Sequence, residues 1–200
     1  MALHYAVQIN ALDALIRRSS NPPFMLEIEV KAPCADLIAL EKRLRDMGAR
    51  DFGRSMQKDV YYAHPTRDFG QTDEALRLRI DNDLQMITYK GPKLDDQSKT
   101  REEIEISVSS AERMALVLER LGFKPVLSVS KIRRIYGLGG ISVCLDSVKG
   151  LGDFVEFEYE GGSMEEGKRA IFLLMKDLNV SGNERRSYLE LLLEKRAESK

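Results

Sequence analysis

The sequence has few of the residues that zinc centres and disulfide frameworks require. It contains two cysteines, two histidines and no tryptophan in 200 residues. Cys34 and Cys144 are far apart and form no CxxC pair, and His4 and His64 are equally isolated. A zinc site needs a tighter set of ligands, and a Cys–His dyad has only distant pairs to draw on. We therefore interpret the cysteines as free thiols in a reducing cytoplasm.

Long apolar runs and an excess of one charge are also missing. No apolar run approaches the roughly 20 residues that a membrane-spanning helix needs. The 31 basic and 32 acidic residues leave a net charge of -1, which argues against a broad basic surface for nucleic acid. A GxxxxGK[ST] phosphate loop is absent as well. The sequence thus predicts a cytoplasmic protein with no membrane or nucleic-acid partner and no P-loop.

The first 24 residues differ in pattern from the rest of the chain. "YAVQINALDALIRR" has a weak helical period, and the consecutive prolines Pro22 and Pro23 end it. The stretch lacks the long apolar region of a secretory signal, whereas a transit peptide stays open. Met25 opens the first strong strand directly. We therefore expect an N-terminal extension at 1–24 and one functional domain at 25–200.

Alternation of apolar and polar residues predicts at least seven strands, most of them in hairpins. Two turns support the hairpins, one at Asp81-Asn82-Asp83 and one at Gly139-Gly140. Helical spacing predicts helices between strands and at the end of the chain. An antiparallel α+β domain is the expected fold class. The expected strands are 26–32, 58–64, 74–80, 84–90, 101–108, 129–138, 141–148 and 154–160, the helices are 33–49, 110–122, 164–178 and 185–198, and 91–100 is a loop.

The polar side of the first strand is unusually charged. In "LEIEVKA", Glu27, Glu29 and Lys31 alternate with Leu26, Ile28 and Val30. Side chains of a strand point to opposite faces in turn, so two carboxylates and an ammonium share one face. Later strands repeat this alternation, with charged residues at Arg77, Arg79, Lys90, Arg101, Glu103, Glu105, Lys131, Arg133, Asp146, Glu156 and Glu158.

Two arrangements explain such a charged face. For any single strand, a face exposed to water is the more common explanation. Repetition in six strands instead favours a barrel whose apolar side faces outward against helices, with the charges collected inside one lumen. Arg and Lys bind the closely spaced oxygens of a polyphosphate, and carboxylates suit that site only if they hold a divalent cation that bridges to the same oxygens. The charges together therefore point to a metal–triphosphate complex.

An ordered set of motifs makes the chain resemble a known superfamily. "ExExK" at Glu27, Glu29 and Lys31 is followed by "QKDVYY", "LRLR", "TYKGP", "REEIEI", "KIRRIY", "VCLDSVKGLGDFVEFE" and "RRSYLELL". This set resembles the CYTH superfamily, the triphosphate tunnel metalloenzymes, over roughly Met25 to Glu194. "YKGP" and "GLGxFxExE" look most like the class IV adenylyl cyclase branch. The extension at 1–24 falls outside the family pattern.

The resemblance implies a closed eight-stranded antiparallel β-barrel, the triphosphate tunnel, with helices packed outside. It also implies that the cations contact the substrate during catalysis and that the acids hold Mg²⁺ or Mn²⁺. Glu103 and Glu105 match acidic positions of the family without an assigned role. The implied cations are Lys31, Arg77, Arg79, Lys90, Lys131 and Arg133, and the implied metal ligands are Glu27, Glu29, Asp146, Glu156 and Glu158.

The resemblance leaves several activities open. The first is an adenylyl cyclase that converts ATP to cyclic AMP and pyrophosphate. Inorganic triphosphatase and thiamine triphosphatase share the same tunnel, and a non-catalytic module that binds nucleotide or polyphosphate is a further alternative. The expected ligand is a nucleoside triphosphate or inorganic triphosphate, and a homodimer stays open. The sequence identifies neither a general base nor the residues that contact a nucleoside.

Overall fold

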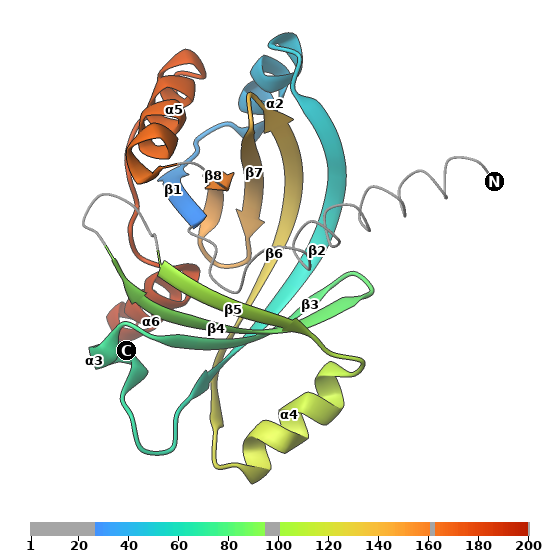
Figure 1. The fold of residues 1–200 in the computed structure, drawn as a ribbon, viewed down its shortest axis with the longest axis vertical. Helices are drawn as coiled ribbons and strands as arrows, with labels where there is room; N and C mark the ends of the chain where they lie inside the picture. The colour runs from blue at the N-terminus through green and yellow to red at the C-terminus, as the bar shows by residue number, and fades with distance from the viewer. Residues whose placement is uncertain (1–26, 95–100, 161–162, 200) are drawn as a thin grey trace, which may run out of the picture.

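The computed structural model describes residues 27–94, 101–160 and 163–199. The extension expected at 1–24 and most of the loop expected at 91–100 lie outside these residues. The described chain forms one antiparallel sheet with helices around it, which confirms the α+β class (Figure 1). The strands are β1 (Glu27–Pro33), β2 (Arg50–Ala63), β3 (Ala75–Asp81), β4 (Leu84–Lys93), β5 (Arg101–Ser107), β6 (Lys124–Leu138), β7 (Ile141–Val148) and β8 (Gly152–Glu160).

The described helices lie between strands or at the end of the chain. In Figure 1, α2 and α5 lie near one end of the sheet, and α4 lies below β3, β4 and β5. None of them combines the length and the apolar character that crossing a bilayer requires. The helices are α2 (Leu37–Asp46), α3 (Phe69–Thr72), α4 (Ala111–Arg120), α5 (Met164–Asp177) and α6 (Tyr188–Glu198).

The sheet is deeply curled, and its strand order is β1-β5-β4-β3-β2-β6-β7-β8, with β8 pairing again with β1. The β1–β5 junction consists of one registered pair, Glu27 with Arg101. Both strands begin at this pair and, being antiparallel, run away from it in opposite directions. A longer ladder would need residues before Glu27 or within 95–100, outside the described chain. The full closure predicted from the sequence is thus met at one position, and the sheet is otherwise open along this seam.

The apolar side of β1, β7 and β8 faces outward and packs under helices. Val30, Val143 and Phe157 are fully buried against residues of α2 and α5. α5 lies so close to the sheet that a Cβ atom at Gly167 would come within 2.4 Å of Ile28 Cδ1. Only glycine permits this approach. Because apolar side chains of these strands point outward, the alternating charged ones point to the inner face.

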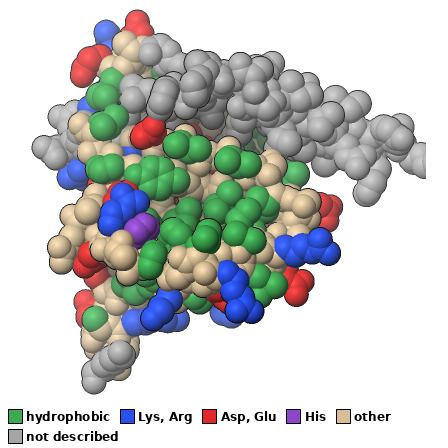
Figure 2. Space-filling view, turned by 60° about the horizontal axis from the view of Figure 1, so that its bottom comes forward, with side chains coloured by type: hydrophobic (Ala, Val, Ile, Leu, Met, Phe, Trp, Pro, Cys, Tyr) green, Lys and Arg blue, Asp and Glu red, His purple; other side chains and the backbone are tan. Residues whose placement is uncertain are grey.

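A second apolar layer covers the outside of β2, β3 and β4. Tyr62 and Leu78 pack against Ala111 and Leu118 of α4. The outer surface of α4 is partly apolar too, since Leu116, Val117 and Leu121 are exposed. Figure 2 shows hydrophobic side chains gathered on the face that the lower side of Figure 1 presents. α4 therefore bridges the sheet and an apolar outer surface.

The third apolar cluster lies inside the curl. Tyr61, Val129 and Phe154 alternate with outward residues on their strands, and they pack against Tyr188 at the start of α6. The Tyr188 and Phe154 rings meet edge to face, with centroids 5.2 Å apart. The end of the chain thus packs against the inner side of the sheet.

Both predicted hairpins are confirmed, while several element boundaries differ. Asn82 (φ 51°) and Asp83 join β3 to β4, and Gly139 and Gly140 join β6 to β7 with positive φ at both positions. β2 begins eight residues before the predicted start at Lys58, and β6 five residues before Val129. β4 also continues through the "GPK" that was expected to open a loop. Short-range alternation fails at these ends because ladder pairing extends the strands.

Candidate active site

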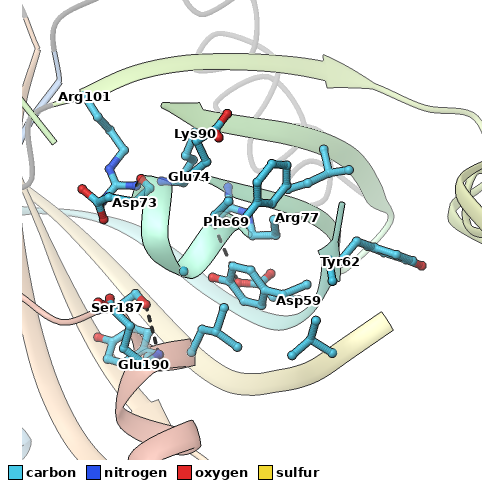
Figure 3. Close-up of a pocket in the computed structure, with 18 of the residues that line it drawn as sticks. Asp59, Tyr62, Phe69, Asp73, Glu74, Arg77, Lys90, Arg101, Ser187 and Glu190 are labelled. Carbon is cyan, nitrogen blue, oxygen red and sulfur yellow. Dashed lines mark hydrogen bonds and ion pairs between the residues drawn. The ribbon is translucent and has the colours of Figure 1, made fainter. Parts of the chain in front are cut away.

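The charged inner face of the sheet lines a cavity of about 970 Å³. Its walls come from β1 to β6 and β8, from the segment between β2 and β3, and from the start of α6 (Figure 3). The cavity is at the upper end of the range typical of small-molecule sites. Among the described residues, ten acidic and seven basic side chains line it. Both signs of charge predicted for one lumen are therefore present in one cavity.

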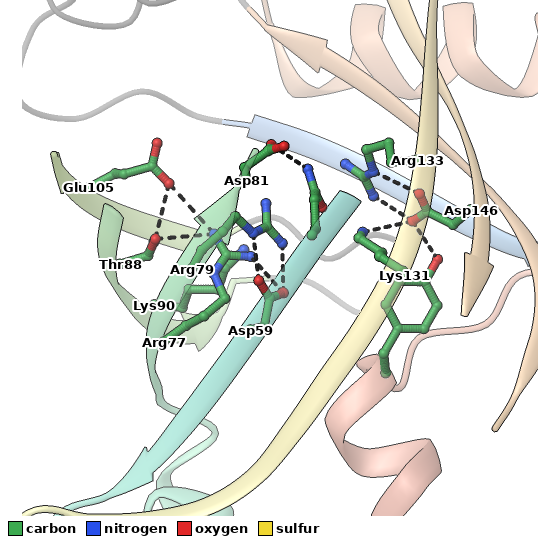
Figure 4. A network of polar contacts seen from close by, with 12 residues as sticks. Asp59, Arg77, Arg79, Asp81, Thr88, Lys90, Glu105, Lys131, Arg133 and Asp146 are labelled. Carbon is green, nitrogen blue, oxygen red and sulfur yellow. Dashed lines mark hydrogen bonds and ion pairs between the residues drawn. The ribbon is translucent and has the colours of Figure 1, made fainter. Parts of the chain in front are cut away.

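Basic and acidic residues of β6, β7 and β8 form one buried cluster (Figure 4). Arg133 donates from Nε to Asp146 Oδ1 at 2.7 Å and from a terminal nitrogen to Asp146 Oδ2 at 2.6 Å. Lys131 Nζ donates to Asp146 Oδ2 at 2.7 Å. Arg133 also bonds to Glu156, and to Glu158 Oε1 at 3.1 Å. This cluster holds two predicted cations against three predicted metal ligands.

A second cluster lies across the cavity on β2, β3, β4 and β5. Arg79 makes a two-pronged ion pair with Asp59, with both hydrogen bonds at 2.7 Å. Arg77 donates to Thr88 Oγ1 at 3.1 Å and lies 3.5 Å from Glu105. Its Nε atom is buried and has no hydrogen-bond partner among the described residues. Bidentate geometry fixes the Arg79 guanidinium, whereas Arg77 keeps an unused donor.

Lys90 and Arg101 complete the cationic wall on the β4–β5 side. Lys90 Nζ bonds to Glu103, its cross-strand neighbour. Arg101 lies 3.7 Å from Asp73, which also accepts a hydrogen bond from Lys93 Nζ. Each of these cations is therefore already paired with a carboxylate within the protein.

Burial and pairing compete in setting the charge of the site. Burial alone would raise the pKa of Asp59, but the charge and hydrogen bonds of Arg79 outweigh it and hold that pKa well below its ordinary value. Asp146 follows the same rule, since Arg133 and Lys131 outweigh its burial and lower its pKa. For Lys131, burial and the neighbouring Arg133 charge win, and its pKa is lowered. The two aspartates thus stay ionised, and Lys131 loses its proton more readily than a solvent-exposed lysine does.

Lys31 lies behind the cavity wall. Its ammonium is fully buried, lies 4.0 Å from the centroid of the Tyr188 ring and donates to the backbone oxygen of Arg186. The Tyr188 hydroxyl in turn donates to Asp146 Oδ2 at 2.9 Å. Lys31 therefore stabilises the segment that leads into α6 and does not line the cavity.

The predicted metal ligands are distributed unevenly. Glu29, Glu156 and Glu158 line the cavity, and Glu29 lies directly opposite Glu158 in the β1–β8 ladder. Asp146 is buried beneath them, and the side chain of Glu27 lies outside the described part. Among the described residues, no three acidic, histidine or cysteine side chains converge into a metal-binding group. Carboxylate oxygens suit a hard cation such as Mg²⁺ or Mn²⁺. In this structure Asp146, Glu156 and Glu158 are paired with Arg133.

Comparison with known proteins gives this geometry a family. A sequence profile of the CYTH domain matches residues 25–189. The chain belongs to the CYTH family. The charged lumen is therefore a CYTH site, as the motifs predicted. Members of the family are enzymes that act as adenylyl cyclases or triphosphatases.

Individual relatives align with between half and most of the chain. A Methanocaldococcus jannaschii protein provisionally named an adenylate cyclase is 40% identical over 172 residues, which is 84% of this chain and 98% of that protein. An Aeromonas hydrophila adenylate cyclase is 31% identical over 51% of each chain. A solved Pyrococcus horikoshii structure is 42% identical, with a TM-score of 0.76 over 84% of this chain and 99% of the other.

Sequence reasoning missed two residues of this CYTH site. Asp59 alternates with Gln57 and Tyr61, a signal that places it on the inner face, but the motif that contains it carried no assigned role. Tyr188 likewise lies in a family motif, "RRSYLELL", without an assigned role, and helical spacing does not show that α6 directs its first side chain into the lumen. The substrate-contacting and metal-binding roles assigned from the resemblance stay predictions.

Proposed function

We propose that the protein processes a triphosphate substrate in the charged lumen with the help of Mg²⁺ or Mn²⁺. The observation that carries this proposal is the cavity that gathers five of the six predicted cations. Arginine forks and lysine ammonium groups suit the oxygens of a polyphosphate, and the buried Nε of Arg77 offers a donor for one more oxygen. We further propose that the seam between β1 and β5 closes, so that the lumen is a tunnel.

The balance of charges in the cavity supports a divalent cation. Its lining carries more acidic than basic side chains, so a bare polyanion would meet net repulsion. Glu29 and Glu158 are directly opposed like charges, and although Arg133 contacts Glu158, a divalent cation between the two carboxylates would lower their repulsion further. Glu29, Glu156 and Glu158 would hold the ion, with Glu27 and Asp146 as further candidates. Bound there, the ion would polarise phosphate oxygens as a Lewis acid.

The residues of the chain would position the phosphates and stabilise developing charge. Arg77, Arg79 and Lys90 extend from one wall, and Lys131 and Arg133 extend from the other. Gripping the terminal phosphates from both sides would fix the α-phosphate and stabilise the charge on departing pyrophosphate. In the cyclase reaction the ribose 3′-hydroxyl attacks the α-phosphorus, its proton is lost to solvent, and the bond to pyrophosphate breaks. Hydrolysis would use water as the nucleophile instead.

We propose the cyclase reaction as the specific activity. The cyclase names of the archaeal and Aeromonas relatives support it, together with the "YKGP" and "GLGxFxExE" motifs. Inorganic or thiamine triphosphatase is the second candidate, because the cations that grip the phosphates suit every branch alike. A non-catalytic nucleotide or polyphosphate binder is the third candidate.

Product analysis with matched substrates tests this proposal. Purified protein is incubated with ATP, 3′-deoxy-ATP, inorganic triphosphate and thiamine triphosphate, each with Mg²⁺ or Mn²⁺. A cyclase yields cyclic AMP and pyrophosphate from ATP and neither from 3′-deoxy-ATP, since the attacking hydroxyl is missing. ADP and phosphate from both nucleotides would overturn the cyclase activity in favour of hydrolysis. Binding without any product would leave only the non-catalytic alternative.

A further inference from the structure

The cavity has an apolar end in addition to its charged lumen. Phe69 of α3, Val126 of β6 and Leu189 and Leu193 of α6 line the same cavity as the cations. We call these four residues the apolar mouth. Figure 3 shows Phe69 lining one pocket with Arg77, Lys90 and Asp59. The mouth is therefore continuous with the phosphate-binding region.

Phe69 is held firmly at this mouth. The guanidinium of Arg67 lies 5.3 Å from its ring centroid, and the His64 ring lies 5.5 Å away. His64 Nδ1 accepts hydrogen bonds from the backbone nitrogens of Thr66 and Arg67, at 3.1 and 3.0 Å. The Phe69 carbonyl also accepts from the backbone of Asp73. An aromatic surface fixed in this way loses little freedom when a ligand stacks on it.

The acids near Phe69 are occupied by contacts within the protein. Asp68 caps α3 by accepting from the Gly70 nitrogen at 3.0 Å, and Glu190 accepts from the Ser187 nitrogen at 2.6 Å. Glu74 accepts from the Tyr89 hydroxyl at 2.6 Å and pairs with Arg67 at 3.1 Å. The mouth therefore presents apolar and aromatic surface. That surface suits a flat, uncharged ring better than a cation.

We propose that the apolar mouth binds the base of a nucleoside triphosphate by stacking on Phe69, while the charged lumen holds the phosphates. The inference rests on the proposed triphosphate function and narrows its substrate class. Inorganic triphosphate has no group that would use the mouth, and the cavity of about 970 Å³ exceeds what three phosphates fill. Phe69 is accordingly a specificity-determining residue.

Paired binding measurements test the proposal. Titration calorimetry compares ATP with inorganic triphosphate on the full chain, with Ca²⁺ in place of Mg²⁺ to slow turnover. Phe69→Ala should weaken ATP binding about tenfold and leave triphosphate binding within about twofold, because an aromatic ring typically contributes on this scale to binding a base. Phe52→Ala is the matched control, since Phe52 is half-exposed, lies under Arg50 at 4.9 Å and does not line the cavity. It should change neither affinity.

A second variant and a spectroscopic signal distinguish a specific loss of base binding from misfolding of Phe69→Ala. Leu193 is exposed on α6, so Leu193→Ser should fold normally and also weaken ATP alone. The fluorescence of 2-aminopurine riboside triphosphate should fall on binding to the wild type and stay high with Phe69→Ala. Equal losses of ATP and triphosphate in both variants, or unchanged ATP binding, would overturn the aromatic mouth. If wild type bound neither ligand, the proposed function itself would fail.

Discussion

Glu29 lies at the point where the chain places like charges face to face. We predict that Glu29→Ala abolishes metal-dependent turnover, because it removes a carboxylate expected to hold the ion. The free energy of unfolding should stay the same or rise, since Glu158 loses a facing negative charge. Turnover against Mn²⁺ concentration and urea unfolding check both parts. The exposed Glu102→Ala on β5 serves as control, and full turnover of Glu29→Ala at limiting Mg²⁺ would remove Glu29 from the metal site.

Asp59 contributes a buried carboxylate whose charge depends on Arg79. We predict that Asp59→Asn lowers the free energy of unfolding by about 3 kcal/mol at pH 7, because it leaves a buried guanidinium without its ionic partner. The native pKa of Asp59 lies below its unfolded value, so its contribution is present above about pH 4 and lost as the pH falls through the native pKa.

Urea unfolding at several pH values measures this difference. The gap between wild type and Asp59→Asn should be constant from about pH 5 to 8 and shrink below about pH 4. Asp46→Asn, which breaks the exposed Lys42–Asp46 pair, should cost less than about 0.5 kcal/mol. A gap that persisted unchanged at pH 2 would contradict the ionic origin of the effect.

At the scale of elements, α6 carries a side chain, Tyr188, that contacts charged residues of three strands at once. The Tyr188 hydroxyl bonds to Asp146, and its ring lies 4.0 and 4.9 Å from the ammonium groups of Lys31 and Lys131. We predict that Tyr188→Phe costs about 1.5 kcal/mol of stability and Tyr188→Ala about 4 kcal/mol, because only the second removes the packed ring. Urea unfolding distinguishes the two, and equal losses would show that ring packing contributes nothing.

For the whole molecule, we predict that the prolines at 22 and 23 separate the N-terminal extension from the CYTH domain. A chain that starts at Met25 should fold and retain turnover, because the family profile begins there and the assigned site residues all follow it. Circular dichroism, thermal unfolding and product formation compare it with the full chain. Insolubility or lost turnover would show that residues 1–24 belong to the domain, for instance by completing the seam at Glu27.

Much of the architecture followed from local pattern. Strict alternation identified the strands, and Gly139-Gly140 and Asp81-Asn82-Asp83 identified two hairpins that the fold confirms. The short helix α3 was not predicted, because its four residues are too few to show a helical period. The position of Phe69 at the cavity was therefore not predicted either. The packing role of Gly167 could not be predicted from the sequence either, because it depends on how closely α5 approaches Ile28.

The sequence by itself determined which side chains share a face, because a strand alternates with a period of two whatever surrounds it. It therefore placed Arg77 with Arg79 and Lys131 with Arg133, on faces of mixed charge. Arg133 and Asp146 face each other across the predicted Gly139-Gly140 hairpin, so that pair followed from the turn. Only the tertiary structure decided that β2 brings Asp59 beside Arg79 of β3 and that α6 places Tyr188 beneath Lys31. Those contacts join segments distant in the chain, and their geometry depends on the curl of the sheet and the docking of α6. The alternation of residues along one strand indicates neither the curl of the sheet nor the docking of α6.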